Sequence, residues 1–143
     1  MEVTGTMQDW PTGRLLSTAS RMVEHAWGDA LEKLGLTHAG LVVLHLLSSG
    51  PQSQTELAKQ ARVQVQTMSR TLERLEREGY VEREKHPQDA RRHVVSRTAA
   101  GRRTWSAASS LEADLFPPMA DTGELREALL GIISSLTATR WEE

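Results

Sequence analysis

Residues 53–101 read SQTELAKQARVQVQTMSRTLERLEREGYVEREKHPQDARRHVVSRTAAG, and this stretch decides the fold. Its pattern predicts a short helix, a turn, a longer helix, and then two strands joined by a polar hairpin. That order of elements is typical of a winged helix-turn-helix, a module that places its second helix in a groove of DNA.

The two helices of this stretch have defined ends. Ser53 and Glu56 have the spacing of a capping box, which predicts a short helix to about residue 60. A longer helix is expected over residues 65–78, and it ends at Gly79, where a left-handed backbone is favoured. Its buried face is expected to carry the apolar residues that recur at helical spacing: Met68, Leu72 and Leu75.

A hairpin follows the second helix. Residues 80–85 and 93–97 alternate in polarity and predict two antiparallel strands. Residues 86–92 between them form a polar tip, in which Pro87 and Asp89 supply turn chemistry.

Further helices flank the module on both sides. Apolar residues recur at three- and four-residue spacing over residues 15–34 and again over residues 125–136, and each pattern predicts one amphipathic helix. Residues 37–48 and 98–116 are expected to form two more, each opened by a threonine. The fold class predicted for residues 1–143 is a single domain, mainly α with a small β wing.

The composition is that of an ordinary globular protein. The chain has 143 residues, of which 38% are hydrophobic and 25% charged, and it has no cysteine. The absence of thiols excludes disulfides, a thiol redox switch and cysteine-bound zinc. No apolar run approaches the roughly 18 residues of a membrane helix, and the N-terminus lacks the order of a signal peptide. We therefore expect a cytoplasmic protein with no membrane contact.

Charge is divided unevenly along the chain. The net charge is −2, but residues 53–103 hold twelve Lys or Arg against seven Asp or Glu, a balance of +5. The remaining residues have a balance of −7. A basic module within an acidic body suits phosphate binding, because the attraction to DNA is local. Charge alone fits a solvated charge run equally well.

The expected second helix carries polar residues where DNA would be read. The outward positions near its start are free of acids: Gln64, Gln66, Thr67 and Arg70. Gln pairs with adenine edges, and Arg pairs with guanine or phosphate. Arg74 lies further along, where contact with the DNA backbone is expected. The alternative is a solvated helix with Glu–Arg pairs, for which Glu73 and Arg77 are correctly spaced.

The hairpin offers a second contact. Asp89 and Arg91 are two residues apart, so the carboxylate can hold the guanidinium in a fixed pose. An oriented arginine suits a narrow minor groove, where negative potential is focused. Arg92 and His93 could contact phosphates. The alternative is a surface salt bridge in a turn, which contributes less than about 1 kcal/mol.

The chain resembles the multiple-antibiotic-resistance regulator (MarR) family of bacterial transcription factors. The matching segments are Leu36-Thr37, QTELA at 54–58, TMSR at 67–70, LERLE at 72–76, GYV at 79–81, PQDAR at 87–91 and TAAG at 98–101. The resemblance implies a homodimer that binds a pseudo-palindromic operator, usually as a repressor. The full set of expected DNA contacts is Thr55, Gln64, Gln66, Thr67, Ser69, Arg70, Arg74, Asp89, Arg91 and Arg92.

The resemblance also implies where the two chains would pair. Residues 12–35 and 98–140 are expected to be dimerisation helices around a winged lobe over residues 37–97. The apolar stripe over residues 125–136 agrees, because it exceeds what one small core needs. Three features depart from the family pattern: His86 stands where Asp is frequent, Arg97 stands where Leu is frequent, and Gly40-Leu41 replaces an aromatic often found early in the second helix.

A ligand site is suggested by four aromatic or imidazole residues. His38 and His45 are seven residues apart on one helix, and His25 and Trp27 lie on the helix expected beside it. Together they could bind a small aromatic or phenolic effector. The alternative is that Trp27 packs in the core while the histidines are ordinary surface residues. No carboxylate stands at ligand spacing beside them, so no metal is expected, and no cofactor is implied.

Two other function classes were weighed. A winged helix can dock to proteins without specific DNA binding, but such a module has no need of a concentrated positive charge. An enzyme is not expected, because the sequence has no glycine-rich phosphate loop, no nucleophile elbow and no paired carboxylates in an apolar setting.

Overall fold

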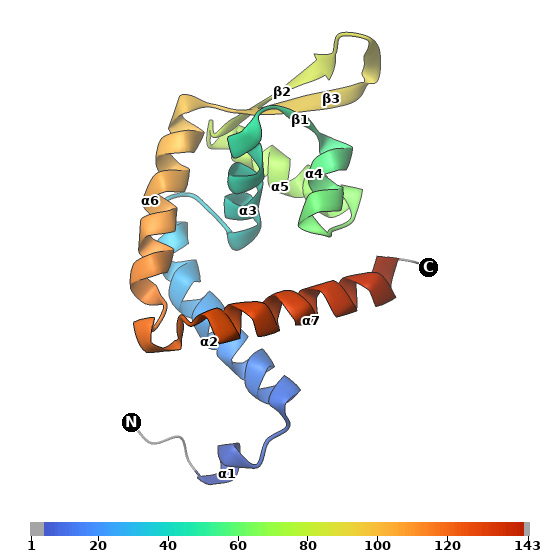
Figure 1. Cartoon of the computed structure of the whole chain (residues 1–143). Coiled ribbons are helices and arrows are strands. Elements are labelled where there is room, and N and C mark those ends of the chain that lie inside the picture. Colours follow the sequence, from blue (N-terminus) through green and yellow to red (C-terminus); the bar gives the residue numbers. More distant parts are fainter. Residues whose placement is uncertain (1–4, 142–143) are drawn as a thin grey trace.

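The computed structural model describes residues 5–141, apart from the side chains of residues 5, 90, 91, 119 and 138–141. The described chain is mainly helical with one small sheet (Figure 1), which confirms the predicted fold class. Its α-helices are α1 (Gly5–Gln8), α2 (Thr12–Glu32), α3 (His38–Leu46), α4 (Gln54–Ala61), α5 (Val65–Arg77), α6 (Ala99–Leu115) and α7 (Gly123–Trp141). The strands are β1 (Gln52–Ser53), β2 (Val81–His86) and β3 (Asp89–Arg97), and the short 3-10 helices are η1 (Leu47–Ser49) and η2 (Pro118–Ala120).

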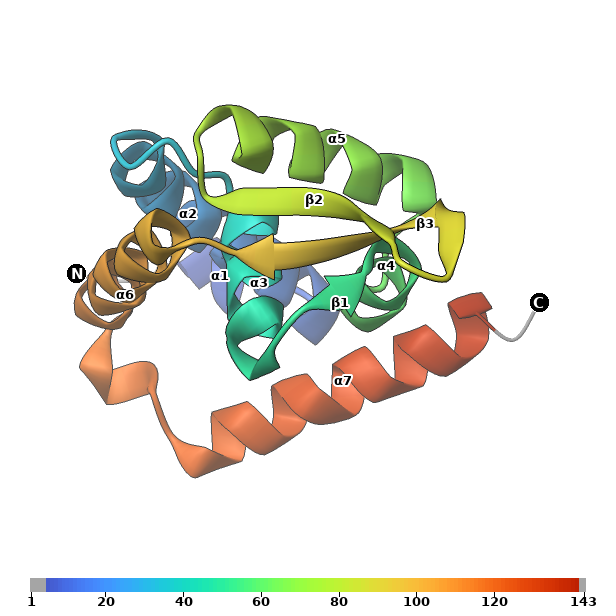
Figure 2. The same cartoon turned by 90° about the horizontal axis from the view of Figure 1, so that it is seen from above.

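Two regions make up this arrangement. We call residues 36–98 the winged lobe, and α2, α6 and α7 the arm helices. The arm helix α6 lies along one side of the lobe, α2 packs against α6 and extends below the lobe, and α7 passes beneath it (Figure 1). Seen from above, β2 and β3 lie across the lobe beside α5, and α7 runs along the opposite side (Figure 2).

The core lies inside the winged lobe. Four elements each contribute a fully buried residue to one hydrophobic cluster: Leu44 of α3, Leu57 of α4, Leu72 of α5 and Val95 of β3. The sheet has the antiparallel order β1-β3-β2. Strand β1 was not expected from the sequence, because two residues are too short to show an alternating pattern.

Hydroxyl side chains open four of the helices. Each accepts a hydrogen bond from the backbone N–H three residues later, at 3.0–3.1 Å: Thr37 from Gly40, Ser53 from Glu56, Thr98 from Gly101 and Thr122 from Leu125. The first three confirm the expected helix starts. For α7 the acceptor is Thr122, directly before the helix begins.

The recognition-helix candidate α5 is held by its apolar face. Met68, Leu72 and Leu75 are at most 2% exposed, as predicted. The turn that precedes α5 contains Arg62 in the left-handed conformation, with φ 59° and ψ 45°. A residue with a side chain is uncommon in that conformation. The Nε of Arg62 donates to the hydroxyl of Thr137 on α7 at 2.8 Å.

Tyr80 joins the lobe to the arm helices. Its hydroxyl donates to the carbonyl oxygen of Leu34 at 2.5 Å, just beyond the end of α2. Its own carbonyl accepts from the backbone N–H of Thr98, just before α6, at 3.0 Å. The same carbonyl leaves no room for a Cβ at residue 101, which explains why glycine stands there.

The arm helices expose much of their apolar surface. Met22 on α2 is 69% exposed, and Leu130 and Leu136 on α7 are 60% and 65% exposed. Within the described part of the chain, no helix is both long enough and apolar enough to cross a membrane.

Candidate nucleic-acid interface

The first turn of α5 presents polar side chains to solvent. Gln64 is the N-cap residue, yet its side chain makes no capping hydrogen bond, so the amide is available for an external partner. Gln66, Thr67 and Arg70 are exposed as well, and the turn contains no acid. Exposed N–H groups at a helix N-terminus favour anions, and this adds to the attraction for phosphate.

Two of the expected contacts on α5 are less accessible. Ser69 and Arg74 are only partly exposed, because they lie nearer the buried face of the helix. The hydroxyl of Thr71, beside them, donates to the backbone carbonyl of Thr67 at 3.1 Å. The side-chain hydroxyl of Thr67 takes no part in that hydrogen bond. The accessible part of α5 is therefore its first turn together with Arg70.

The start of α4 lies next to the start of α5. A notch of about 180 Å³ is lined by Thr55, Val65, Arg92 and His93 together with Ser53 and Gln54. The structure thus brings three expected contacts on separate elements, Thr55, the α5 N-terminus and Arg92, to one surface. Both Thr55 and Arg92 are exposed there.

Arg83 is a residue of this region that the sequence analysis missed. Its Nε forms a salt bridge with Oε1 of Glu76 at 2.6 Å, and its NH1 donates to Oε1 of Gln54 at 3.4 Å. The side chain therefore joins β2 to both α5 and α4. A signal existed in the alternation of β2, because Arg83 follows the buried Val81 by two residues and shares its side of the strand.

The wing is longer in its strands and tighter at its tip than the sequence indicated. Residues 86–92 were expected to form a polar tip, but β2 continues to His86 and β3 begins at Asp89, so only Pro87 and Gln88 form the turn. The imidazole Nδ1 of His86 accepts from the backbone N–H of Gln88 at 3.1 Å, which stabilises this short turn.

The strand register shifts just behind the tip. Lys85 pairs with His93 while His86 pairs with Asp89, so residues 90–92 form an irregularity in β3. Such bulges redirect side chains, and here they redirect the segment with two arginines. Asp89 is partly buried and Arg92 exposed, whereas the side chain of Arg91 lies outside the described residues.

Three of the four ligand-site candidates belong to two aromatic pairs where α3 meets α2 and α6. The rings of Trp27 and His38 stack with centroids 6.1 Å apart, and the rings of His45 and Trp105 lie 5.8 Å apart. The guanidinium of Arg97 lies over Trp105 at 5.3 Å and also donates to the carbonyl of Leu44 at 3.2 Å.

Glu112 on α6 interacts electrostatically with one histidine of each pair. Burial raises the pKa of its carboxyl above the ordinary value, and the nearby His38 and His45 oppose that rise. No sequence pattern links Glu112 and Trp105 to the histidines, because only the packing of α6 on α3 brings them together. His25 is exposed on α2, and no aromatic contact joins it to either pair among the described residues.

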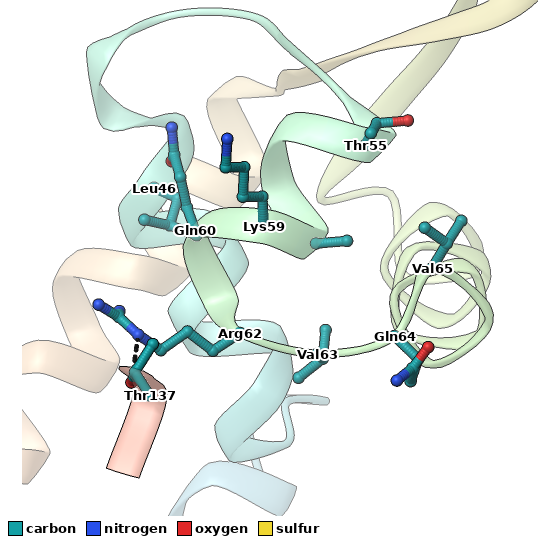
Figure 3. A pocket seen from close by; sticks show the side chains of 10 residues that line it. Leu46, Thr55, Lys59, Gln60, Arg62, Val63, Gln64, Val65 and Thr137 are labelled. Carbon is teal, nitrogen blue, oxygen red and sulfur yellow. Dashed lines mark hydrogen bonds between the residues drawn. The ribbon is translucent and has the colours of Figure 1, made fainter. Parts of the chain in front are cut away.

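Two cavities lie near these regions. One of about 380 Å³ is lined by Trp27, Glu112, Phe116 and residues of α7. A larger one of about 930 Å³ lies below α4 and the α4–α5 turn, where Arg62 reaches Thr137 (Figure 3). Among the described residues, no three His, Asp or Glu side chains are grouped as metal ligands.

Comparison with known proteins identifies the family. The model of the MarR family matches residues 36–93. The HTH-type transcriptional repressor Rv2887 of Mycobacterium tuberculosis is 36% identical over 99 residues, which span 68% of this chain and 71% of the relative. The chain belongs to the MarR family. The HTH-type transcriptional regulator YdcH of Bacillus subtilis is 32% identical over 94 residues, which span 62% of this chain but only 64% of the relative.

A solved structure extends the likeness to most of the chain. The transcriptional repressor CouR, bound to a 23-mer DNA duplex, superposes with a TM-score of 0.76 at 27% identity, covering 95% of this chain and 99% of that one. These relatives are regulators of transcription and not enzymes, which confirms the expectation that the chain is not an enzyme. As a MarR-family member the chain is a transcriptional regulator.

Proposed function

We propose that the chain is a homodimeric repressor that binds a pseudo-palindromic operator. In this proposal the first turn of α5 enters the major groove, with Gln64, Gln66, Thr67 and Arg70 at the bases and phosphates. Thr55 and Arg92 contact the DNA backbone, together with Ser69 and Arg74 at the edge of the interface. Asp89 orients Arg91 toward the minor groove at the wing.

The observation that carries the proposal is the shared surface of α4, α5 and the wing. An uncapped Gln64, an exposed Arg70, and Thr55 beside Arg92 lie on elements that one rigid core fixes relative to one another. Fixed spacing between a helix N-terminus and a wing is what docking on a duplex requires. The DNA-bound state of the similar repressor CouR supports the same assignment.

Dimerisation is supported by the arm helices. Large apolar side chains on α7 and α2 remain 38–69% exposed in a single chain: Leu15, Met22, Leu130, Ile132, Ile133 and Leu136. So many apolar side chains on long helices suit a self-complementary interface between two copies. A two-fold dimer would also place two α5 helices on a palindrome.

We further propose that a small aromatic or phenolic ligand releases the operator. Trp27 and His38 offer stacking surfaces, and His45 lies near Glu112 on the neighbouring helix. The cavity of about 380 Å³ beside Trp27 is large enough for a one-ring ligand. His25 stays in the proposal only as a contact supplied across a dimer interface, because it is exposed on α2.

Selection of bound DNA from a random duplex pool tests the main proposal. We expect a palindrome whose half-sites are about one helical turn apart, bound by two chains. The alternative function is a winged module that docks to proteins without specific DNA binding. Recovery of unrelated sequences, with no binding even at low salt, would favour that alternative.

A further inference from the structure

One exposed apolar residue has no counterpart on the rest of the winged lobe. Eight large hydrophobic residues are exposed in the described chain, and seven lie on the arm helices: Leu15, Met22, Leu115, Leu130, Ile132, Ile133 and Leu136. The eighth is Val65, which is 50% exposed on α5. The arm helices have a dimer interface to explain their exposure, and Val65 lies outside it.

Val65 is not needed to close the core. At the start of α5, that role belongs to Val63 and Met68, since Met68 is 2% exposed and Val63 packs against the core cluster. This pair has the spacing of a hydrophobic staple, with one residue before the N-cap and the other one turn into the helix. Val65 belongs neither to the core cluster nor to the residues packed against it.

Helix propensity does not explain the valine either. A β-branched residue is a weaker helix former than the polar residues that surround it. An exposed valine at the first position of α5 therefore lowers the helix propensity and also leaves apolar surface in contact with water. A contact with an external apolar group would remove that apolar surface from water and offset the cost.

The position of Val65 indicates where that group would be. The residue lies between Gln64 and Gln66 at the very N-terminus of α5 and shares a notch with Thr55 and Arg92. Figure 3 views α5 nearly end-on, with Val65 and Gln64 at its near end and Thr55 on the adjacent helix. These neighbours are the residues that the proposed function places against DNA.

The major groove presents one apolar group, the C5-methyl of thymine. We infer that Val65 contacts a thymine methyl in each half-site and makes an A·T pair at that position a requirement of the operator. The adjacent glutamines match this assignment, because Gln pairs with the edge of adenine. This inference rests on the proposed function and adds a chemical specificity to it.

Uracil substitution isolates the methyl group. In the selected operator, each half-site thymine is replaced in turn by deoxyuridine, which keeps the base pair and loses only the methyl. For the wild-type protein we expect one position at which affinity falls about three- to fivefold per half-site, the effect of burying one methyl group. With Val65→Ala, affinity for the thymine operator falls and the uracil penalty at that position disappears.

A control variant and titrations at low salt allow the effect of Val65 to be separated from a general loss of binding. Gln66→Ala is expected to weaken binding to thymine and uracil operators by the same factor, because its contact does not involve the methyl. Titrations are made at low salt, where phosphate contacts strengthen binding enough to measure every variant. Circular dichroism confirms that Val65→Ala retains its helices.

Each possible outcome either supports the inference or overturns it. A uracil penalty lost only in Val65→Ala supports the inference. A penalty that persists in Val65→Ala, an operator indifferent to uracil at every thymine, or half-sites with no fixed A·T pair would overturn it while leaving the proposed function intact. Absence of any sequence-specific binding would overturn the proposed function itself.

Discussion

The winged lobe and the arm helices use their apolar residues in opposite ways. Twelve of the fourteen buried apolar residues lie in the lobe, while α2 and α6 contribute one each, Leu31 and Ala108. The side chains of α7 that the structure describes, up to residue 137, contribute none to this core, although Ile132, Ile133 and Leu136 are among them. The lobe therefore buries its apolar residues within one chain, whereas the arm helices leave apolar surface that the proposed dimer would cover.

Removing a side chain from the lobe core should have the largest effect. Leu72 is fully buried between α5 and its neighbours, so Leu72→Ala is expected to lower the free energy of unfolding by about 2–5 kcal/mol. Urea denaturation followed by circular dichroism measures this loss. A change under about 0.5 kcal/mol would break the comparison, because the lobe would then not depend on its own core.

A charge on α7 should act on assembly and not on the lobe. Ile133 is 48% exposed in the single chain, and Ile133→Glu is expected to weaken dimerisation roughly 100-fold, because a buried charge lacks a partner there. Sedimentation velocity measures the change. Ser134→Glu, at an adjacent exposed position, is the matched control. Equal dissociation in both variants would argue against an interface on the apolar stripe.

On the surface of the lobe, Arg70→Ala should weaken operator binding by about tenfold, since one charged contact is lost. The dimer should remain intact, and the salt dependence of affinity should become shallower. Arg77, exposed in the last turn of α5, provides the control, and Arg77→Ala should change affinity less than twofold. Fluorescence anisotropy with labelled operator compares the two, and similar losses would reject the first turn as the contact region.

The smallest effect is expected at the junction of the two regions. Because burial raises the pKa of Glu112 in the folded protein, its charged form costs stability above that pKa, and the cost disappears as the pH falls. Glu112→Gln should therefore be more stable than the wild type at pH 8, by a few tenths of a kcal/mol for this partly exposed group.

Thermal unfolding at several pH values checks this sign. The advantage of Glu112→Gln should shrink as the pH is lowered and the wild-type carboxyl loses its charge. Asp114→Asn, at an exposed position of the same helix, is the control. A stability difference that grew toward acidic pH would contradict the assigned cause.

The parts of the fold that the sequence predicted are those governed by neighbours along the chain. Helix starts at Thr37, Ser53 and Thr98 follow from hydroxyl groups three residues before an N–H, and the buried face of α5 follows from spacing. The length of the hairpin tip was predicted less well from its turn residues. The strands extend closer to Pro87 than polarity suggested, because the tip is stabilised by His86 and by cross-strand pairing.

The missed features depend on contacts between distant segments. Arg83 joins residues on two helices, and Glu112 approaches His38 and His45 only after α6 packs on α3. Val65 was passed over for a different reason: in the sequence, a valine near a helix start is indistinguishable from a core residue. Only its exposure in the folded chain separates it from Val63.

Tyr80 lies where the winged lobe joins the arm helices, so a small rotation there becomes a larger displacement at the far end of α5. The chain enters the lobe after Leu34 and leaves it at Thr98, and Tyr80 bonds to both places, so Tyr80 forms a pivot beside the direct contacts of α3 with α2 and α6. This pivot lies at the C-terminal end of α5, whose thirteen residues extend about 20 Å to the reading end. A tilt of about 6° at the pivot moves that end by about 2 Å, enough to break a hydrogen bond at the far end. A shift of the arm helices at this pivot would therefore change the position of the far end of α5.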